Sequence, residues 1–152
     1  MTSRPPVPES TARALFAARL VQARELRGLS QRALGDRMGL GKEKGSSRIN
    51  RYEHQVTAIG FDNLDKLAEI LDVPVAYLLA DNAAMADAIL ELSKANKRQQ
   101  ATLAQALKGL TATPALTKAL VKLLQLPDSE RERITQSLLD LLPDPKGKAE
   151  DA

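Results

Sequence analysis

The stretch from Leu20 to Leu40, "LVQARELRGLSQRALGDRMGL", predicts two short helices joined by a tight turn. Its apolar residues recur at helical spacing up to Gly28, and glycine commonly follows the last turn of a helix. Ser30 is a favourable N-cap for a second helix, which we expect over residues 31–38. Gly39 then ends that helix. The stretch therefore indicates a compact helix pair.

Three more short helices are predicted around this pair. Upstream, Ser10 or Thr11 can cap the first helix, which then runs to about residue 27. Downstream, Ser46 is a plausible cap for a third helix that ends near residue 54. Apolar residues at helical spacing predict a fourth helix over residues 61–72, and residues 75–79 form a short fifth turn or helix. We expect an all-α domain of five helices over residues 10–80, preceded by a flexible arm over residues 1–9.

The composition sets limits on the chemistry that this chain can perform. It has 152 residues, of which 43% are apolar and 3% aromatic, so the core must consist of Leu, Ala, Ile and Val. With no Cys and one His, disulfides, thiolate metal sites and a histidine zinc cluster are excluded. No apolar run approaches the length of about 20 residues that a membrane span requires. We expect a cytoplasmic protein without metal or cofactor.

Positive charge is concentrated in the first third of the chain. From Ser10 to Ala58 there are ten Lys and Arg residues against four acids, a local charge of +6, although the whole chain carries only +3. This asymmetry suggests a polyanionic partner. A solvated basic face would produce the same pattern, so charge alone leaves both interpretations open.

Beyond residue 80 the sequence predicts a helical oligomerisation region, residues 81–142, and a disordered tail, residues 143–152. One interpretation is a weak heptad-like seam with a polar centre, typical of a two-stranded coil. The other is two shorter helices that fold back near Asn96. The last helices start at Thr113-Pro114 and Pro127-Asp128 and have too few apolar residues for their own core, so we expect pairing with a second copy. The residues expected at that contact are Met85, Ile89, Leu92, Asn96, Leu103, Leu138 and Leu142.

Three segments carry a resemblance to a known family. "LVQARELRGLSQRALGDRMGL", "INRYE" and "LDKLAEILDVPVAYLLA" resemble the phage repressor and Cro type of helix-turn-helix regulators, the XRE family, over about residues 12–80. The resemblance implies a repressor-like helix-turn-helix domain that binds double-stranded DNA. It also implies a homodimeric transcriptional regulator, most simply a repressor on a palindromic operator, in a bacterium or phage and close to the nucleoid. No small-molecule pocket is evident.

The resemblance also implies roles for particular residues. Gln31 matches a position that holds a DNA phosphate, Arg24 and Glu53 match an ion pair between helices, and Ile49 matches the buried anchor of the recognition helix. Outward positions around Ile49 carry small polar groups and one Arg, which suit base edges in the major groove. We expect base reading by Ser46, Ser47, Asn50 and Arg51, and phosphate contacts by Gln31, Arg32, Lys42, Lys44 and Arg48.

The sequence departs from the family between the two helices of the motif. Nine residues separate Gly39 from Ile49 where the family has about five, so "GKEK", residues 41–44, looks like an insertion of about four residues. The recognition helix can therefore start at Ser46 or already near Lys42. After that helix, Gln55 stands where the family usually has Gly.

Two other classes of function compete with DNA binding. The acids of residues 62–72 form a stripe at helical spacing, which fits a solvated helix face better than a catalytic site. His54 has no Ser or Cys partner within reach in the sequence, so we expect no enzymatic activity. The alternative that remains open is an antitoxin-like or protein-interaction module whose C-terminal helices bind another protein.

Overall fold

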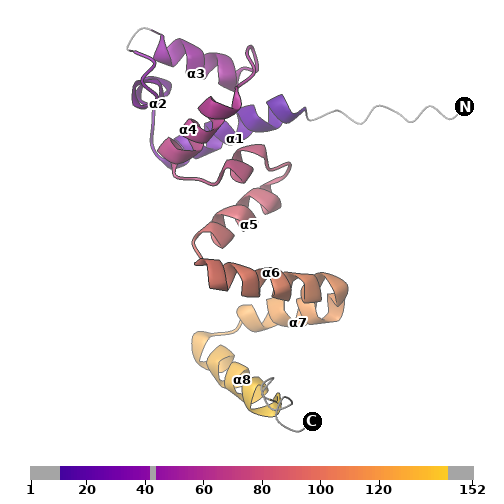
Figure 1. Ribbon diagram of the computed structural model, residues 1–152. Coiled ribbons are helices and arrows are strands. Elements are labelled where there is room, and N and C mark those ends of the chain that lie inside the picture. The colour runs from indigo at the N-terminus through magenta and orange to yellow at the C-terminus, as the bar shows by residue number, and fades with distance from the viewer. Residues whose placement is uncertain (1–10, 42–43, 144–152) are drawn as a thin grey trace, which may run out of the picture. The chain divides into compact units, whose positions relative to one another are not determined.

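The computed structural model describes residues 11–41 and 44–143, and in them the protein is entirely helical (Figure 1). The all-α prediction, a helix-turn-helix domain followed by further helices, is confirmed. The described residues divide into two compact units, with the boundary between Gln100 and Ala101. The elements are α1 (Ala12–Leu26), α2 (Gln31–Arg37), α3 (Gly45–Glu53), α4 (Phe61–Leu71), the 3-10 helix η1 (Val75–Leu79), α5 (Ala83–Ser93), α6 (Lys97–Ala112), α7 (Pro114–Leu124) and α8 (Asp128–Leu141).

Local signals set the ends of the first two helices. The Thr11 hydroxyl accepts a hydrogen bond from the Ala14 backbone at 3.2 Å, so Thr11 is the cap of α1, while Ser10 lies outside the described residues. Gly28 adopts φ +62°, a left-handed conformation that glycine enters at little cost. The Ser30 hydroxyl then accepts from the Ala33 backbone at 3.1 Å and caps α2. The turn between α1 and α2 therefore follows directly from the residues in it.

Helices α2 and α3 meet backbone to backbone at two glycines. A Cβ atom added at Gly35 would lie 2.5 Å from the carbonyl carbon and 2.6 Å from the Cα of Gly45. One added at Gly45 would lie 3.0 Å from the Gly35 backbone. No side chain therefore fits at Gly35 unless the helices separate.

The recognition helix starts one residue before the expected cap. The structure begins α3 at Gly45, and Ser46 lies inside the helix instead of capping it. The reason is that the Gly45 N–H bonds to the Gly41 carbonyl at 2.9 Å, which closes a turn just ahead of the helix. Of the inserted residues, Gly41 and Lys44 belong to the connection. Lys42 and Glu43 lie outside the described residues, so the expected phosphate contact of Lys42 has no structural counterpart here.

Two arginines counted with the basic surface belong to the framework. Arg19 is buried, and its Nε donates to the Ala80 carbonyl at 3.0 Å, which ties α1 to the end of η1. Arg27 donates to the Leu71 and Asp72 carbonyls at 2.7 and 2.6 Å. A cation there stabilises the C-terminus of α4, where the backbone carbonyls lack helical partners. The positive charge that remains for a polyanion is smaller than the sequence count.

Of the two interpretations left open after residue 80, the continuous seam does not form, because the helix breaks between Ser93 and Lys97. Asn96, predicted as a polar seam residue, is the N-cap of α6. Its side chain accepts from the Gln99 backbone at 3.0 Å, and the Gln99 side chain accepts from the Asn96 backbone at 3.0 Å. This reciprocal pair is a capping box, which starts a new helix at that point. The alternative of two shorter helices is the correct one.

Helix α5 belongs to the N-terminal unit. Ala86 is buried in the same hydrophobic cluster as the helix-turn-helix core, and Ile89 and Leu90 pack against that cluster. The structure therefore divides the chain after Gln100, whereas the sequence analysis expected a boundary after residue 80. Ile89, expected at a contact between copies, is a core-packing residue of its own chain.

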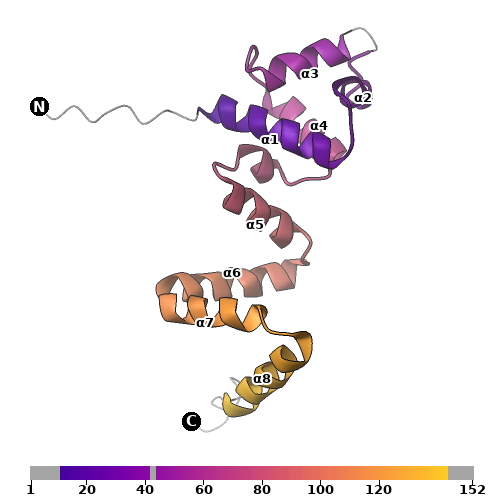
Figure 2. The same cartoon turned by 180° about the vertical axis from the view of Figure 1, so that it is seen from behind.

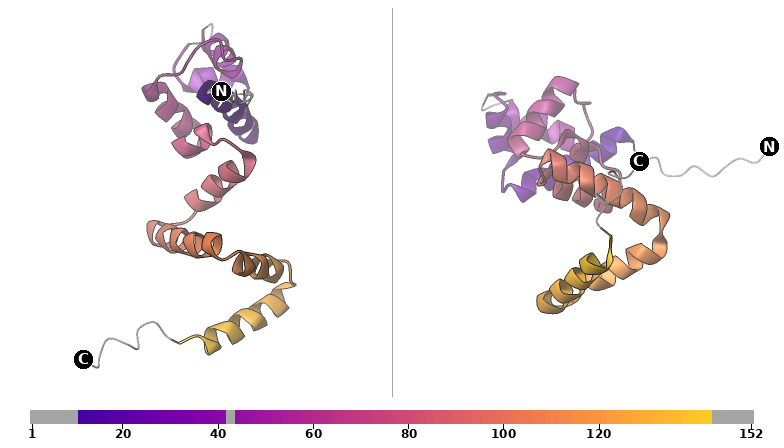
Figure 3. Two further views of the ribbon diagram at one scale, coloured as in Figure 1. Left: turned by 90° about the vertical axis from the view of Figure 1, so that its right-hand side faces the viewer. Right: turned by 60° about the horizontal axis from the view of Figure 1, so that its bottom comes forward.

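The C-terminal unit has little core of its own. Helices α7 and α8 follow α6 through short turns (Figure 3), and none of the three contains a buried residue. Thr113 precedes Pro114 at the start of α7 as expected, but its side chain makes no capping hydrogen bond. The Thr117 hydroxyl donates instead to the Leu110 carbonyl at 2.7 Å, which fixes the turn between α6 and α7.

Replacing Gly35 tests the backbone contact between α2 and α3. Alanine normally stabilises a helix interior relative to glycine, but Gly35→Ala should destabilise the protein by about 1–3 kcal/mol because the new methyl group overpacks the contact. The matched control is Gly109→Ala in α6, where a Cβ meets nothing within 4 Å and stability should rise slightly. Chemical unfolding followed by circular dichroism measures both changes. An unchanged Gly35→Ala variant would show that the helices can separate freely.

Candidate DNA-binding interface

An ion pair across the N-terminal unit holds the end of α3 against α1. The Arg24 guanidinium donates to both Glu53 carboxylate oxygens, at 2.6 and 3.2 Å, and to the Leu29 carbonyl at 2.9 Å. The two side chains are only 14% and 4% exposed. The hydrogen bond to Glu53, before any other cause, raises the pKa of Arg24 above its ordinary value. The pair connects the first and third helices.

Gln31 extends this network to the surface of α3. Its Nε2 donates to Glu53 at 2.7 Å, and its Oε1 accepts from the Asn50 amide at 3.5 Å. The side-chain nitrogen that the sequence analysis assigned to a DNA phosphate is therefore directed inward to Glu53. Asn50 remains exposed, with its amide nitrogen turned toward Gln31. The four side chains form a chain of hydrogen bonds from α1 to the outer face of α3.

The outer face of α3 carries a line of exposed polar residues. Helix α3 lies at the edge of its unit in opposite views (Figure 1 and Figure 2), with Gly45, Ile49 and Tyr52 buried. Steps of three and four residues along the opposite side place one exposed set in a single row. Its members are Lys44, Ser47, Arg51 and His54. Such a face, narrow and free of acids, fits the dimensions and chemistry of a major groove.

The four predicted base-reading residues are not equivalent in the structure. Ser47, Asn50 and Arg51 are exposed, whereas Ser46 is half-buried on the flank of the helix. His54 joins the exposed row, with Nδ1 2.9 Å from the Asn50 carbonyl. In the sequence, His54 was considered only as a catalytic residue, so its place in this row was not predicted. His54 lies seven residues after Ser47, which is about two helical turns, and this spacing could have placed it on the same face of the helix.

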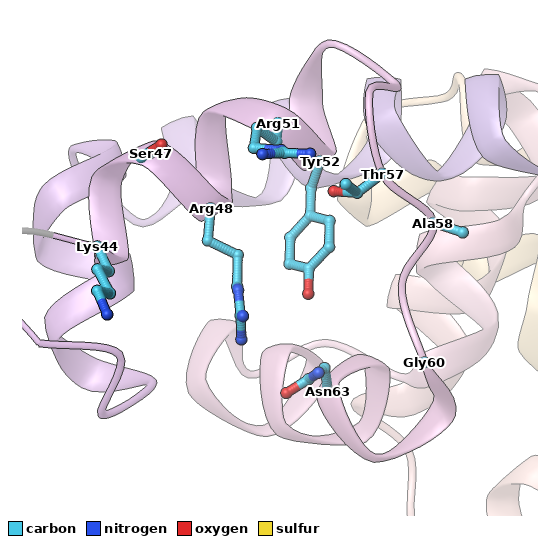
Figure 4. A pocket seen from close by; sticks show the side chains of 9 residues that line it. All are labelled: Lys44, Ser47, Arg48, Arg51, Tyr52, Thr57, Ala58, Gly60 and Asn63. Carbon is cyan, nitrogen blue, oxygen red and sulfur yellow. The ribbon is translucent and has the colours of Figure 1, made fainter.

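Beside this row a basic hollow of about 600 Å³ opens between α3 and the start of α4 (Figure 4). Lys44 and Arg48 extend from α3 into it, and Asn63 faces them from α4. Ser47 and Arg51 lie higher on α3 in the same view. None of the described residues that line the hollow is acidic. A backbone phosphate would therefore meet cations and a neutral amide, and no negatively charged side chain would repel it.

The cations of this surface have no carboxylate partner among the described residues. The salt bridges among the described residues involve four other cations, Arg24, Arg27, Lys94 and Arg131. None of them includes Arg32, Lys44, Arg48 or Arg51. Arg32 is exposed on the first turn of α2. An exposed cation without an intramolecular partner is free to displace counterions from a polyanion.

The chain leaves α3 through an unusual conformation. Gln55 adopts φ +61°, the left-handed region that usually selects glycine, at the position where the sequence resemblance implied a glycine. The backbone N–H of Val56 then bonds to the Arg51 carbonyl at 2.8 Å. The turn therefore forms with a polar side chain beside the outer face of α3.

The described residues contain neither a metal-binding cluster nor a membrane-spanning helix. No group of three His, Cys, Asp or Glu residues there is arranged to hold a metal ion. None of the helices in the described ranges has the length and apolar character to cross a membrane. The fold and the exposed face of α3 define a helix-turn-helix DNA-binding protein.

Comparison with known proteins identifies the family. A helix-turn-helix family model matches residues 20–78. The crystal structure of transcriptional regulator BswR is similar with a TM-score of 0.57 and 31% identity, over 63% of this chain and 96% of that chain. No curated protein matches. The chain belongs to the XRE-type helix-turn-helix family and is a DNA-binding transcription regulator.

Loss of the Arg24–Glu53 pair should destabilise the domain. Arg24→Ala leaves the Glu53 carboxylate buried with only Gln31 as a described partner, at an expected cost of about 3–5 kcal/mol in unfolding free energy. The control is the double variant Arg24→Met/Glu53→Leu, which removes both charges and should lose much less unfolding free energy. Equal losses in both variants, measured by urea unfolding, would mean that packing and not charge pairing explains the effect.

Proposed function

We propose that this protein is a sequence-specific repressor that binds a palindromic operator as a homodimer. The observation that carries the proposal is the exposed face of α3, where unpaired Arg51 lines the basic hollow and the exposed side chain of Asn50 donates to Gln31. A helix in the major groove reads bases through such side chains, whereas neighbouring cations fix its position on the backbone. Occupation of an operator within a promoter then blocks transcription.

Within this proposal the residues of α3 have separate tasks. Arg51 forks onto guanine, and Ser47 and His54 supply further groups along the same row. Asn50 turns its amide nitrogen toward Gln31 and so presents its oxygen as an acceptor, for example to the amino group of adenine or cytosine. Gln31 acts here by positioning Asn50. Half-buried Ser46 takes a secondary role.

Phosphate contacts fall to Lys44, at the start of that row, and to the cations beside the row. Lys44 and Arg48 reach a phosphate in the basic hollow, and exposed Arg32 reaches another from the start of α2. These contacts are independent of base sequence and dependent on salt, because each neutralised phosphate releases counterions. Lys42 stays a candidate from the sequence alone.

A homodimer is proposed because one such domain makes few base contacts. Two copies related by a two-fold axis read half-sites about one helical turn apart, roughly 34 Å. The C-terminal unit exposes Leu103, Leu138 and Leu142, which the sequence analysis assigned to the contact between copies. Met85 and Leu92 are exposed on α5 and can contribute.

Arg51→Ala should relax the preference for one base position. The expected loss is about 1–3 kcal/mol on the preferred operator and much less on sites that differ at that position. Arg48→Ala should weaken all sequences alike and reduce the slope of log affinity against log salt by about one unit. Lys108→Ala, which removes one charge from the C-terminal unit, is the control. An Arg51→Ala variant with unchanged base preference in a binding-site selection experiment would contradict base reading by Arg51.

Removal of the C-terminal unit should separate dimerisation from folding. A chain that ends at Gln100 keeps the whole buried core cluster, including Ala86, and should remain folded. It should sediment as a monomer and bind a two-half-site operator more weakly, with affinity close to that for a single half-site. If it dimerises as tightly as the full chain, the contact between copies lies in the N-terminal unit.

A further inference from the structure

The C-terminal unit contains an apolar groove between α7 and α8 that its own side chains leave unfilled. The hollow measures about 450 Å³. Its walls are formed by Leu116, Leu120, Leu123 and Leu126 on one side and Ile134 and Leu138 on the other. The aliphatic stem of Lys122 lies at its rim, and no other charged residue lines it in the described part of the chain.

The chemistry of this groove selects a helix and not a small molecule. Small-molecule sites of similar volume combine apolar walls with several placed polar groups that orient the ligand. Here Lys122 is the single polar residue among the described lining residues. An apolar helix face with anchors at spacings of three and four residues needs no such groups.

The unit also needs a cover for its own stability. Helices α6, α7 and α8 contain no buried residue, and Leu116, Leu124 and Leu138 are 52%, 59% and 48% exposed. Apolar surface of this extent marks an interaction site. A unit of this size without a core depends on association to stay folded. A second copy of the same chain is the partner that is always available.

The distribution of charge along the C-terminal unit indicates which helix occupies the groove. Residues 97–127 contain five Lys and Arg and no acid, whereas residues 128–141 contain four acids and two Arg. Helix α8 is therefore acidic, and α7, which carries one wall of the groove, is basic through Lys118 and Lys122; the other wall, Ile134 and Leu138, belongs to α8. Helix α8 also ends in exposed Leu138, Leu141 and Leu142, at the spacing of a single helical face.

We propose that the α7–α8 groove is occupied by α8 of a second copy. The exchange is reciprocal, so each copy supplies one groove and one inserted helix, and the two α7–α8 pairs close into a four-helix bundle. The inference rests on the homodimer of the proposed function and assigns its surface. It places the main contact between copies in this groove, with the exposed residues of α5 secondary to it.

The absence of cysteine from the chain makes cross-linking a direct test. Full-length Ala119→Cys, in the groove, is mixed with full-length Leu141→Cys, on α8, and oxidised mildly after subunit exchange. The expected product is a disulfide-linked pair of unlike chains, distinguished by mass. Gln136→Cys, on the opposite side of α8, is the matched control and should cross-link to Ala119→Cys far less.

Sedimentation supplies the second measurement. Leu138→Asp should raise the dimer Kd at least about tenfold, because it puts a charge into the apolar contact of both copies. Thr135→Asp on α8 is the control and should change Kd little. Added salt should weaken the wild-type dimer, as attraction between basic and acidic helices requires.

The outcomes separate this inference from the dimer itself. A full chain that dimerises, but shows neither the cross-link nor a changed Kd in Leu138→Asp, overturns the groove assignment and leaves the homodimer standing. A full chain that is monomeric with and without operator DNA overturns both, and the groove then belongs to a different protein. A specific cross-link together with a raised Kd supports the proposal.

Discussion

The geometry of the N-terminal unit depends on the contact between Gly35 and Gly45. Because no Cβ separates them, α2 and α3 approach through their backbones, and a Cβ at Gly35 would lie 2.5 Å from Gly45. This approach sets the position of α3 on α2. The row of exposed side chains on α3 is placed by that position, since the helix is rigid once its inner face is packed around Ile49.

An ion pair fixes the other end of α3, the end away from the glycine contact. The Arg24–Glu53 pair holds the far end of α3, and Gln31 carries the network on to Asn50. A buried ion pair contributes modest net stability but imposes a large cost when one partner is missing, so it favours one arrangement over others. Stability and readout are thus connected, because the carboxylate that anchors the domain also orients a residue of the proposed recognition face.

The two units of the chain differ in how much apolar surface they bury. The N-terminal unit buries a contiguous apolar cluster, with Leu20, Leu34, Ile49, Leu67 and Leu78 fully inaccessible. The C-terminal unit has helices with good local signals, such as Pro114 at the first turn of α7, but no residue of those helices is buried. The similarity to BswR covers 63% of this chain, so about a third lies outside it.

Signals confined to a few residues determined much of the fold in advance. Ser30 as cap and Gly28 as helix terminator act within three or four residues of their partners, so the sequence alone predicted the all-α class and the helix pair. The capping box of Asn96 and Gln99 was equally local, but the same two residues also fitted a heptad seam. Two patterns of similar period competed there, and periodicity by itself could not choose between them.

Other features were decided only by the tertiary structure. Arg19 bonds to a carbonyl 61 residues away and Gln31 to a carboxylate 22 residues away, so no local pattern distinguishes them from exposed cations and phosphate donors. The close approach of Gly35 on α2 to Gly45 on α3 likewise joins residues ten positions apart and from two different helices. The sequence by itself determined which segments are helices, because capping and periodicity are short-range. Packing decided which side of each helix is buried and which is exposed, because that depends on contacts between residues far apart in the chain.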